Sequence, residues 1–542
     1  MELMTTTQVW EGFDATELEL DSVLLSKKED VSSYTYLAKR VSDGDVTIDI
    51  KVYSPNFESQ NVVLLVGSYT KIPQKGIIDD LVKKGYIVCL PDFGGILENT
   101  ATVFPESLDY GYYAKAGNHA NKMCLTPIET TQYLYAVIIR RAITFINKIL
   151  NKEKIVIMGL SDGVEIAMQV AGEEKRINGL VCINGASYLE YVKHNKYDSE
   201  EMIMDDDMLS WLTGVSSTSY AKKIQVPVMF AIGSNGTLSD IDRLSNIFNI
   251  IQHNKIRAVI SAKYIDNIDY RAYNSVVSFI KYCFVGSMPP EMPDIELDFN
   301  EDGTIYANVL IDNIIEAEKV RVFYSVGEYN HATRYWQVAA GESAGLKEYI
   351  AKLNVKLGDS PLFVFAEIQY KNGLLLSSLP YFHKLPLTNE TNNSSISSPI
   401  VFYYNSNIEE FTEVSSDEVI LEGSVREGTL PIGLKGICCD NGSLISFAIG
   451  NKNKISKDKI LQVDAYSDVE DTMFSITAIT SGENNEEFTA KVVLDCEDSF
   501  VSLKFDCSDF KNAKFMPLMT WSQMKGIRIN NNKVVIGKIM FI

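Results

Sequence analysis

The sequence has little histidine and lacks the cysteine patterns that build metal or redox sites. It contains five histidines in 542 residues, and none lies between His253 and His331. The eight cysteines form no C-x-x-C pair and no zinc-like Cys/His spacing. Several of them lie in apolar, strand-like runs, so we expect buried free thiols in a reducing compartment. We predict no metal and no cofactor. A structural calcium in the C-terminal domain is an alternative without support, because it needs about six converging oxygens.

The chain also lacks an excess of positive charge, a secretory signal and a long hydrophobic run. Its formal net charge is −21, whereas a nucleic-acid binder needs clustered Lys and Arg. The first thirty residues are acidic and show no basic start followed by an apolar run. No apolar stretch approaches the roughly 18 residues that cross a bilayer. We predict a cytoplasmic protein, or a secreted one if a leader has been removed, with neither nucleic acid nor membrane as a partner.

The pattern of apolar runs predicts three domains. From Val62 to Phe284, short β-branched runs alternate with helical stretches, which is typical of a parallel sheet covered by helices. After the proline-rich "GSMPPEMP", strand-like alternation continues without long helices. The polar tract "PLTNETNNSSISSP" predicts a linker. The predicted units are an α/β domain over residues 1–285, an immunoglobulin-like sandwich over 294–385, a linker over 386–399 and a jelly roll over 400–542.

One stretch, "KIVIMGLSDGVEIAMQVAG", carries a catalytic motif. Gly159, Ser161 and Gly163 form a Gly-x-Ser-x-Gly turn between an apolar strand and an amphipathic helix, which is the context of a nucleophile elbow. Side chains at the two glycine positions would collide with the neighbouring strand and helix. The turn would therefore raise Ser161 above the sheet as a nucleophile.

Residues 1 to about 285 resemble the α/β-hydrolase superfamily, particularly its dienelactone-hydrolase-like and acyl-esterase-like members. The matching stretches are "VVLLVGSY", "GYIVCLPDFGG", "YAVIIRRAITFI" and "VIMGLSDG". The resemblance implies a doubly wound, mostly parallel sheet, with Ser161 attacking an acyl carbon. It also implies that the backbone N–H groups of Asp162 and of Ser68 or Tyr69 hold the oxyanion.

The acid and the base of the expected triad are not in their usual places. Asn235 stands where an aspartate should follow "VPVMFAIG", and Asp240 comes a turn later. No histidine follows the last strand, "IRAVIS", and His253 precedes that strand, at the wrong end of a parallel sheet. His119 and His194 lie in excursions after the fourth and sixth strands. Each is a candidate base, with an ordinary loop histidine as the alternative.

The all-β parts carry weaker resemblances. Residues 294 to about 385 resemble the sandwich of hydrolases of the PhoPQ-activated pathogenicity-related type. The last part resembles galactose-binding-like jelly rolls among carbohydrate-binding modules, through "ILQVDAYSDVEDTMFSITA", "EFTAKVVLD" and "FVSLKFDCSDFKNAKFMPLMTWSQMKGIRI". Such modules lay aromatic rings on sugars. The resemblance makes Tyr403, Tyr404, Phe411 and Trp521 candidates, with a core position as the alternative for Trp521.

The sequence therefore leaves two functions open. The first is a serine-type hydrolase that cleaves an ester, on a carbohydrate or a similar acyl substrate, through Ser161, with an incomplete or rearranged triad. The expected ligand is then a small acyl ester or a carbohydrate. The alternative is a non-catalytic α/β-hydrolase fold that binds a glycan or a partner.

Overall fold

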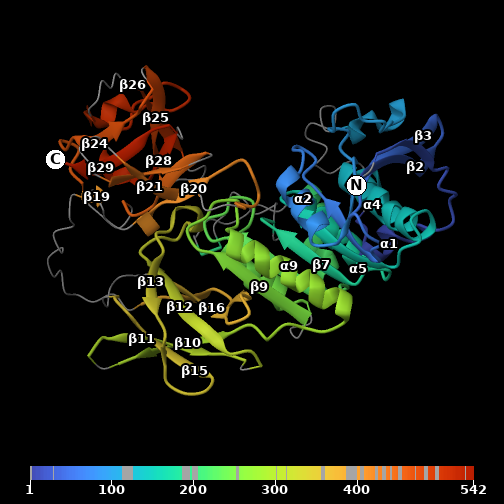
Figure 1. Ribbon diagram of the computed structural model, residues 1–542, viewed down its shortest axis with the longest axis horizontal. Helices are drawn as coiled ribbons and strands as arrows, with labels where there is room; N and C mark the ends of the chain where they lie inside the picture. Colours follow the sequence, from blue (N-terminus) through green and yellow to red (C-terminus); the bar gives the residue numbers. More distant parts are fainter. Residues whose placement is uncertain are drawn as a thin grey trace.

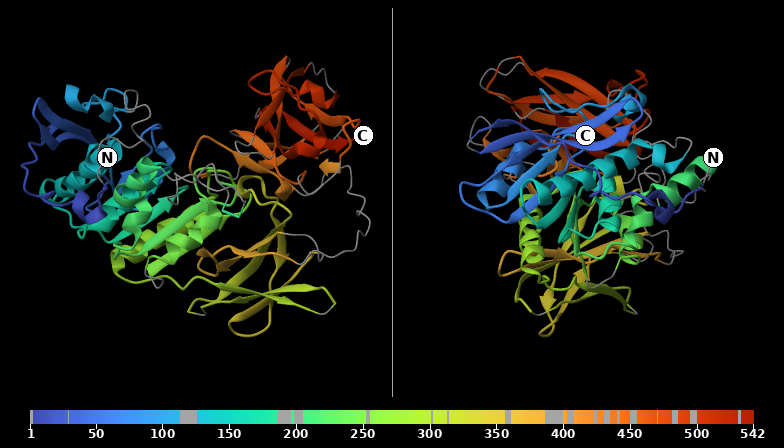
Figure 2. Two further views of the ribbon diagram at one scale, coloured as in Figure 1. Left: turned by 180° about the vertical axis from the view of Figure 1, so that it is seen from behind. Right: turned by 90° about the vertical axis from the view of Figure 1, so that its right-hand side faces the viewer.

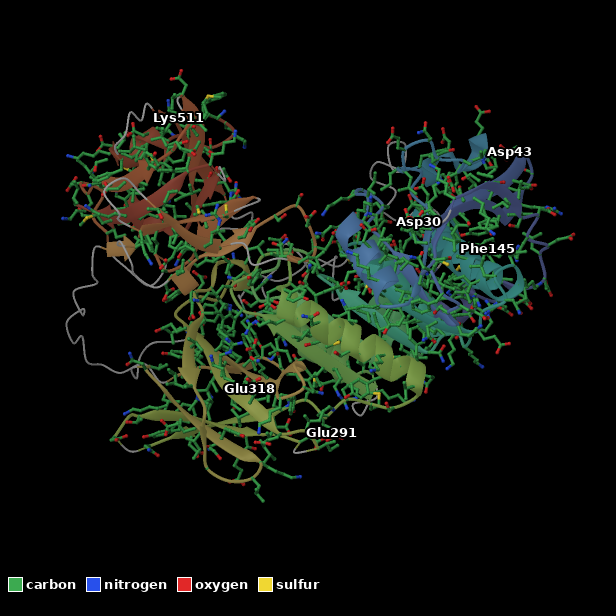
Figure 3. All side chains as sticks on the ribbon, in the orientation of Figure 1. Asp30, Asp43, Phe145, Glu291, Glu318 and Lys511 are labelled. Atoms are coloured by element: carbon green, nitrogen blue, oxygen red, sulfur yellow. The ribbon has the colours of Figure 1, made fainter. Side chains whose placement is uncertain are left out.

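The computed structural model describes residues 3–542 apart from 29, 113–125, 186–195, 198–204, 252–254, 301, 313, 356–360, 386–399, 403–407, 422–424, 430–434, 440–441, 450–454, 470, 481–485, 495–499 and 531–532. The described chain forms three bodies in sequence order, with its two ends far apart along the long axis (Figures 1 and 2). Charged side chains such as Asp43, Glu318 and Lys511 lie at the surfaces of these bodies, whereas Phe145 is buried inside the first (Figure 3).

The first body is built on a nine-stranded sheet with the order β1-β2-β3-β5-β4-β6-β7-β8-β9. Strands β1 to β3 and the β3·β5 pair are antiparallel, and all later pairs are parallel. This order, with β4 placed between β5 and β6, is that of the α/β-hydrolase fold, so the predicted fold class is confirmed. The strands are β1 (Val23–Lys27), β2 (Val31–Val41), β3 (Gly44–Tyr53), β4 (Asn61–Val66), β5 (Ile87–Pro91), β6 (Lys154–Leu160), β7 (Gly179–Ile183), β8 (Val228–Gly233) and β9 (Ile256–Ser261).

Helices cover both faces of this sheet, because its parallel strands are apolar on both sides. Helices α2 (Lys75–Lys83) and α9 (Tyr270–Val285) bury their apolar sides in one core, and α4 (Thr131–Lys148), α5 (Gly163–Glu173), α7 (Ser217–Ala221) and α8 (Ile241–Phe248) in the other. Side-chain caps start several helices: Thr130 accepts from the Tyr133 N–H, and Asp269 from the Ala272 N–H. The other helices described in this body are α1 (Thr6–Val9), α6 (Asp206–Gly214) and the 3-10 helices η1 (Glu106–Gly111) and η3 (Pro127–Glu129).

The second body packs two antiparallel sheets face to face. One has the order β10-β11-β15-β14; the other has β13-β12-β16-β17, with β18 pairing β16. The 3-10 turn η6 (His331–Thr333) lies between β12 and β13. The strands are β10 (Asp294–Phe299), β11 (Ile305–Leu310), β12 (Ala317–Val326), β13 (Gln337–Ala340), β14 (Glu342–Ser343), β15 (Glu348–Leu353), β16 (Leu362–Tyr370), β17 (Leu375–Ser377) and β18 (Tyr381–His383).

The third body is a second antiparallel sandwich, so both all-β predictions of fold class hold. Its sheets have the orders β21-β22-β29-β24-β27, with β19 pairing β29, and β20-β23-β28-β25-β26. The elements are β19 (Ile400–Phe402), η7 (Ile408–Glu410), β20 (Thr412–Val414), β21 (Val425–Thr429), β22 (Lys435–Cys439), β23 (Ser443–Ser446), β24 (Leu461–Tyr466), β25 (Thr472–Thr480), β26 (Glu487–Leu494), β27 (Val501–Phe505), η9 (Cys507–Asp509), η10 (Trp521–Gln523), β28 (Met524–Asn530) and β29 (Val535–Phe541).

The first two bodies share their cores, whereas the third has a core of its own. Phe323, Trp336 and Phe365 of the second body belong to the same apolar cluster as the helices α4 and α5. Strand β17 lies against the last strand of the large sheet, where Ser377 Oγ accepts from the Ile260 N–H at 2.9 Å. The second body thus covers the β9 edge of the large sheet, which protects that edge from pairing with other chains.

The described cysteines of the first body, Cys89, Cys182 and Cys283, are buried free thiols, as expected from the apolar runs around them. Cys438 and Cys439 of the third body are also buried. Burial raises the pKa of the Cys283 thiol to about 12, so the group stays protonated and unreactive at neutral pH. Among the described residues, no helix is both long and apolar enough to span a bilayer.

Candidate active site at the nucleophile elbow

The loop between β6 and α5 has the geometry of a nucleophile elbow. Ser161 has a left-handed backbone (φ 49°), and its N–H donates to the Ile183 carbonyl at 2.9 Å. A Cβ at Gly163 would lie 2.2 Å from the Val66 carbonyl oxygen, and one at Gly159 would lie 2.9 Å from Val164 Cα. The glycines are therefore required by close packing, and a strained serine is held at the carboxyl end of the sheet.

The predicted oxyanion residues lie beside the elbow. Ser68 Oγ donates to Asp162 Oδ2 at 2.9 Å and lies 2.6 Å from Thr70 Oγ1. Burial raises the pKa of Asp162 above its usual value, while the two hydroxyls partly offset that rise. These contacts fix the loop that carries Ser68 and Tyr69 against the start of α5. The cavity lined by Gly67 and Ser68 has a volume of only about 10 Å³, room for a water molecule rather than an acyl group.

The position of the triad acid is occupied by a residue that joins two bodies. Asn235 is fully buried after β8, and its amide nitrogen donates to the Arg334 carbonyl at 2.8 Å and to the Ala332 carbonyl at 3.3 Å. Its amide oxygen accepts from Ser234 Oγ at 2.8 Å. The amide nitrogen thus binds the second body, while the amide oxygen is bonded within the first.

Asp240, the other predicted acid, belongs to a charge network at the same junction. It caps α8 by accepting from the Asp242 and Arg243 N–H groups, and it pairs with the Arg243 guanidinium at 2.9 Å. Asp242 is bound by both terminal nitrogens of Arg334 at 2.6 Å. Within the described part of the chain, Asp240 caps a helix and pairs with charged groups and has no contact with Ser161.

The same network contains the one described cluster with metal-ligating side chains. Asp240, Asp242 and His331 place ligand atoms within 4.8 Å of one another. However, each carboxylate already faces an arginine, and His331 Nε2 lies 3.0 Å from the Gly236 carbonyl oxygen. The negative charge is balanced by the protein itself, which leaves little to attract a cation.

The loop after β9, where the base is expected, is bound to its neighbours on two sides. Asp266 accepts from the Thr237 N–H at 2.7 Å and from the Leu238 N–H at 2.9 Å, which ties this loop to the loop after β8. Burial raises the pKa of Asp266. On the other side, Lys263 Nζ donates to the Glu409 carbonyl at 2.8 Å.

A segment of the third body lies across the carboxyl ends of the strands. We call residues 415–421 the cover segment. Its backbone pairs with Ile268: the Ile268 N–H donates to the Glu418 carbonyl and the Ile420 N–H to the Ile268 carbonyl, both at 3.0 Å. Asn267 Nδ2 donates to the carbonyls of Ser415 and Asp417.

The cover segment also reaches the loops after β7 and β4, on either side of the elbow in the sheet order. Asn184 Nδ2 donates to the Glu418 carbonyl at 2.8 Å, and the Glu418 carboxylate pairs with Lys71 Nζ at 3.0 Å. A Cβ on Gly76 would lie 2.6 Å from Leu421 Cδ1. Three loops at the carboxyl edge of the sheet are therefore held by one segment of the third body.

The remaining predicted site residues divide into two groups. His119, His194, Tyr403 and Tyr404 lie outside the described residues. Trp521 is described and fully buried: its ring packs edge-on against Phe510 and Phe541, and its Nε1–H donates to the Lys459 carbonyl at 2.7 Å. Its ring is unavailable to a sugar, so Trp521 is a core residue of the sandwich, and the buried Phe411 is likewise no sugar platform.

Sequence reasoning missed the cover segment. The only trace of it in "EVSSDEVILEG" is a carboxylate, Glu418, placed directly before the apolar pair Val419 and Ile420. The structure buries all three against the first body, some 150 residues earlier in the chain than the segment itself. A contact between residues so far apart in the sequence produces no local periodic pattern from which it could be predicted.

No family model matches the sequence, and no curated protein matches it. Solved structures with a similar fold include the acetyl xylan esterase from Paenibacillus sp. R4 (16% identity, 49% of this chain and 90% of that chain, TM-score 0.36). Another is Est1E from Butyrivibrio proteoclasticus, with 12% identity, a TM-score of 0.32 and coverage of 44% of this chain and 94% of that chain. A third is the esterase Pf2001 from Pyrococcus furiosus, with 14% identity, a TM-score of 0.29 and coverage of 46% of this chain and 84% of that chain. At these identities and scores the likeness carries no argument about activity, and the fold assignment rests on the strand order and the elbow.

Proposed function

We propose that the first body is a non-catalytic α/β-hydrolase fold that uses its former catalytic face to hold the two β-sandwiches. The observation that carries this proposal is the cover segment, which binds the loops after β4, β7 and β9 at the edge where substrate would enter. In α/β proteins, ligands bind at this carboxyl edge. Here the same edge is used for contacts within the chain.

The acid and base positions support the same proposal. Asn235 carries no charge to stabilise an imidazolium, and both of its polar atoms are already bonded. The loop after β9 has no histidine and is tied down through Asp266, Asn267 and Ile268. Loss of triad members usually removes most of the rate, leaving about 10³- to 10⁴-fold catalysis over water.

A glycan or a protein partner is the ligand class for such a domain. The glycan form of this proposal depends on Tyr403 and Tyr404, because Trp521 is buried and does not offer a ring to a sugar. The three bodies would then act as one scaffold that presents the last sandwich at a fixed position.

A serine-type esterase is the second candidate, and the elbow favours it. Ser161 keeps the strained backbone and the half-buried position of a nucleophile, and the Asp162 N–H has no acceptor among the described residues. In this candidate the substrate is an acyl ester, carbohydrate-linked or free. His119 or His194 then serves as the base, in a rearranged triad.

Labelling of the intact protein with a fluorophosphonate probe tests the two candidates. Such a probe reacts with a serine that a base has activated. The non-catalytic proposal predicts no labelling beyond that of a matched Ser161→Ala variant. Labelling that disappears in Ser161→Ala contradicts it and selects the esterase, and histidine variants would then identify the base.

A further inference from the structure

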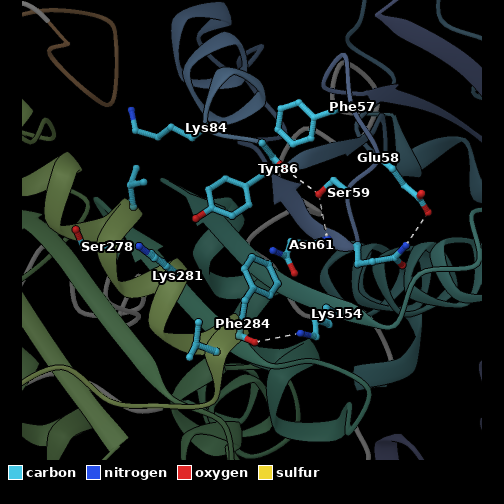
Figure 4. Close-up of a pocket in the computed structure, with 14 residues that line it drawn as sticks. Phe57, Glu58, Ser59, Asn61, Lys84, Tyr86, Lys154, Ser278, Lys281 and Phe284 are labelled. Carbon is cyan, nitrogen blue, oxygen red and sulfur yellow. Dashed lines mark hydrogen bonds between the residues drawn. The ribbon is translucent and has the colours of Figure 1, made fainter.

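A large cavity lies at the opposite edge of the same sheet. It opens between the segment before β4, the turn before β5, the first residue of β6 and the last turns of α9 (Figure 4). Its volume is about 760 Å³, within the range of about 300 to 1,000 Å³ that is typical of small-molecule sites. Asn61 and Lys154 begin their strands here, so this is the amino edge, away from Ser161.

The charge of this cavity is opposite to that of the whole protein. Its lining contains Lys84, Lys154 and Lys281 but a single carboxylate, Glu58, in a chain of net charge −21. Glu58 accepts from Gln60 rather than from a lysine, and in Figure 4 it lies on the far side of the view from Lys281.

Two of the three ammonium groups keep their charge unbalanced. Lys84 pairs with Asp80 at 2.5 Å. Lys154 Nζ, in contrast, donates only to the Phe284 carbonyl, at 3.4 Å, and Lys281 has no partner among the described residues. Lys154 and Lys281 are therefore free to make charge-assisted hydrogen bonds to an anion.

Aromatic rings form the apolar wall. The rings of Tyr86 and Phe284 lie 5.6 Å apart, and the exposed Phe57 ring packs on Gly85, where a Cβ would come within 2.9 Å of its edge. The Tyr86 hydroxyl has no hydrogen-bond partner among the described residues. Burial raises its pKa, so it remains an O–H donor. Such a wall can cover the flat or acyl body of a ligand.

We propose that this cavity binds a small molecule with one anionic group on an aromatic or acyl body. Lys154 and Lys281 hold the carboxylate, phosphate or sulfonate, while Phe57, Tyr86 and Phe284 contact the body. We assign it to binding rather than catalysis, because the hydroxyls of the two described serines in its lining, Ser59 and Ser278, donate to backbone carbonyls rather than to a base. It does not depend on whether Ser161 is active.

Fluorescence titration with 8-anilinonaphthalene-1-sulfonate tests this proposal, with neutral N-phenyl-1-naphthylamine as the matched probe that lacks the sulfonate. We expect saturable binding of the sulfonate by the full chain. A Lys154→Gln/Lys281→Gln variant should bind it at least about tenfold more weakly, because the sulfonate loses its charge-assisted hydrogen bonds to both ammonium groups. The neutral probe should bind both proteins equally.

Two variants complete the design. Lys222→Gln, which removes an exposed lysine at the end of α7 on the other face of the sheet, should leave sulfonate binding unchanged. Phe57→Ala should weaken both probes. Equal sulfonate affinity in the wild type and the double lysine variant overturns the proposal, as does the absence of saturable binding to the wild type.

Discussion

The two edges of the large sheet are built from the same strands but differ in what fills them. At the carboxyl edge, polar side chains such as Asn184, Asn235 and Asn267 are buried and bonded to carbonyls of the two sandwiches. At the amino edge, Lys154 and Lys281 are exposed beside an open cavity. The edge that normally binds ligands holds the two sandwiches, whereas the opposite edge opens onto a cavity.

This difference shows that contacts within the chain can occupy the sheet edge at which such a fold usually binds ligands. A buried polar group must be satisfied, so each bond at the carboxyl edge fixes the sandwiches and also removes a group from chemistry. The exposed lysines at the amino edge do not fix one body of the protein to another. The contrast predicts that substitutions at the first edge change stability, whereas those at the second change binding.

The largest effect is expected for Arg334→Ala. Arg334 is fully buried and binds Asp242 through both terminal nitrogens, so its removal leaves a buried carboxylate without its partner. We expect a loss of about 3 to 5 kcal/mol in the free energy of unfolding, measured by denaturant titration. The matched control is Arg528→Ala, whose pair with Glu487 is partly exposed and should cost less than about 1 kcal/mol.

A smaller, local effect is expected for Asn267→Ala. This change removes the donor to the Ser415 and Asp417 carbonyls of the cover segment, at a cost of about 1 to 3 kcal/mol. The Ile268 and Ile420 amides, which bond across this contact, should exchange their hydrogens faster. Asn308→Ala, which removes the donor of a half-buried side chain to the Asp298 carboxylate in the second body, serves as the control. Unchanged exchange at both amides would show that the cover segment is not held by Asn267.

Asp162→Asn should change the pH dependence of stability. Burial raises the pKa of Asp162 above its unfolded value near 3.8. The resulting stabilisation is therefore fully present below that value and is lost as the pH rises through the folded pKa. The free energy of unfolding of the Asn variant minus that of the wild type should therefore be larger at pH 7 than at pH 4. Thermal unfolding at the two pH values measures this, and a difference of the opposite sign would contradict the assignment.

The smallest effect is expected at the amino edge. Lys281→Gln should leave the free energy of unfolding within about 0.5 kcal/mol of the wild type, because an exposed side chain without a partner contributes little. The same denaturant titration measures it. A loss comparable to that of Asn267→Ala would erase the distinction between the two edges.

The sequence predicted the fold class and the elbow, because both depend on local patterns. Apolar runs identified the parallel strands, and the spacing of Gly159, Ser161 and Gly163 identified the turn. The partners of Asn235 and the position of the cover segment could not be predicted, since these contacts join residues about 100 to 350 positions apart. Trp521 shows the same limit: an aromatic residue near the last strands fits a sugar platform or a core, and only packing decides between them.

The most direct test of the account is to open the carboxyl edge and ask whether Ser161 reacts. An Asn267→Ala/Lys71→Ala variant loses two side chains that hold the cover segment. Its labelling by a fluorophosphonate probe should be compared with that of the same variant carrying Ser161→Ala, after circular dichroism has shown both to be folded. The account predicts equal, background labelling of the two. Strong labelling that requires Ser161 would contradict it and would show an active serine hydrolase closed by its own C-terminal domain.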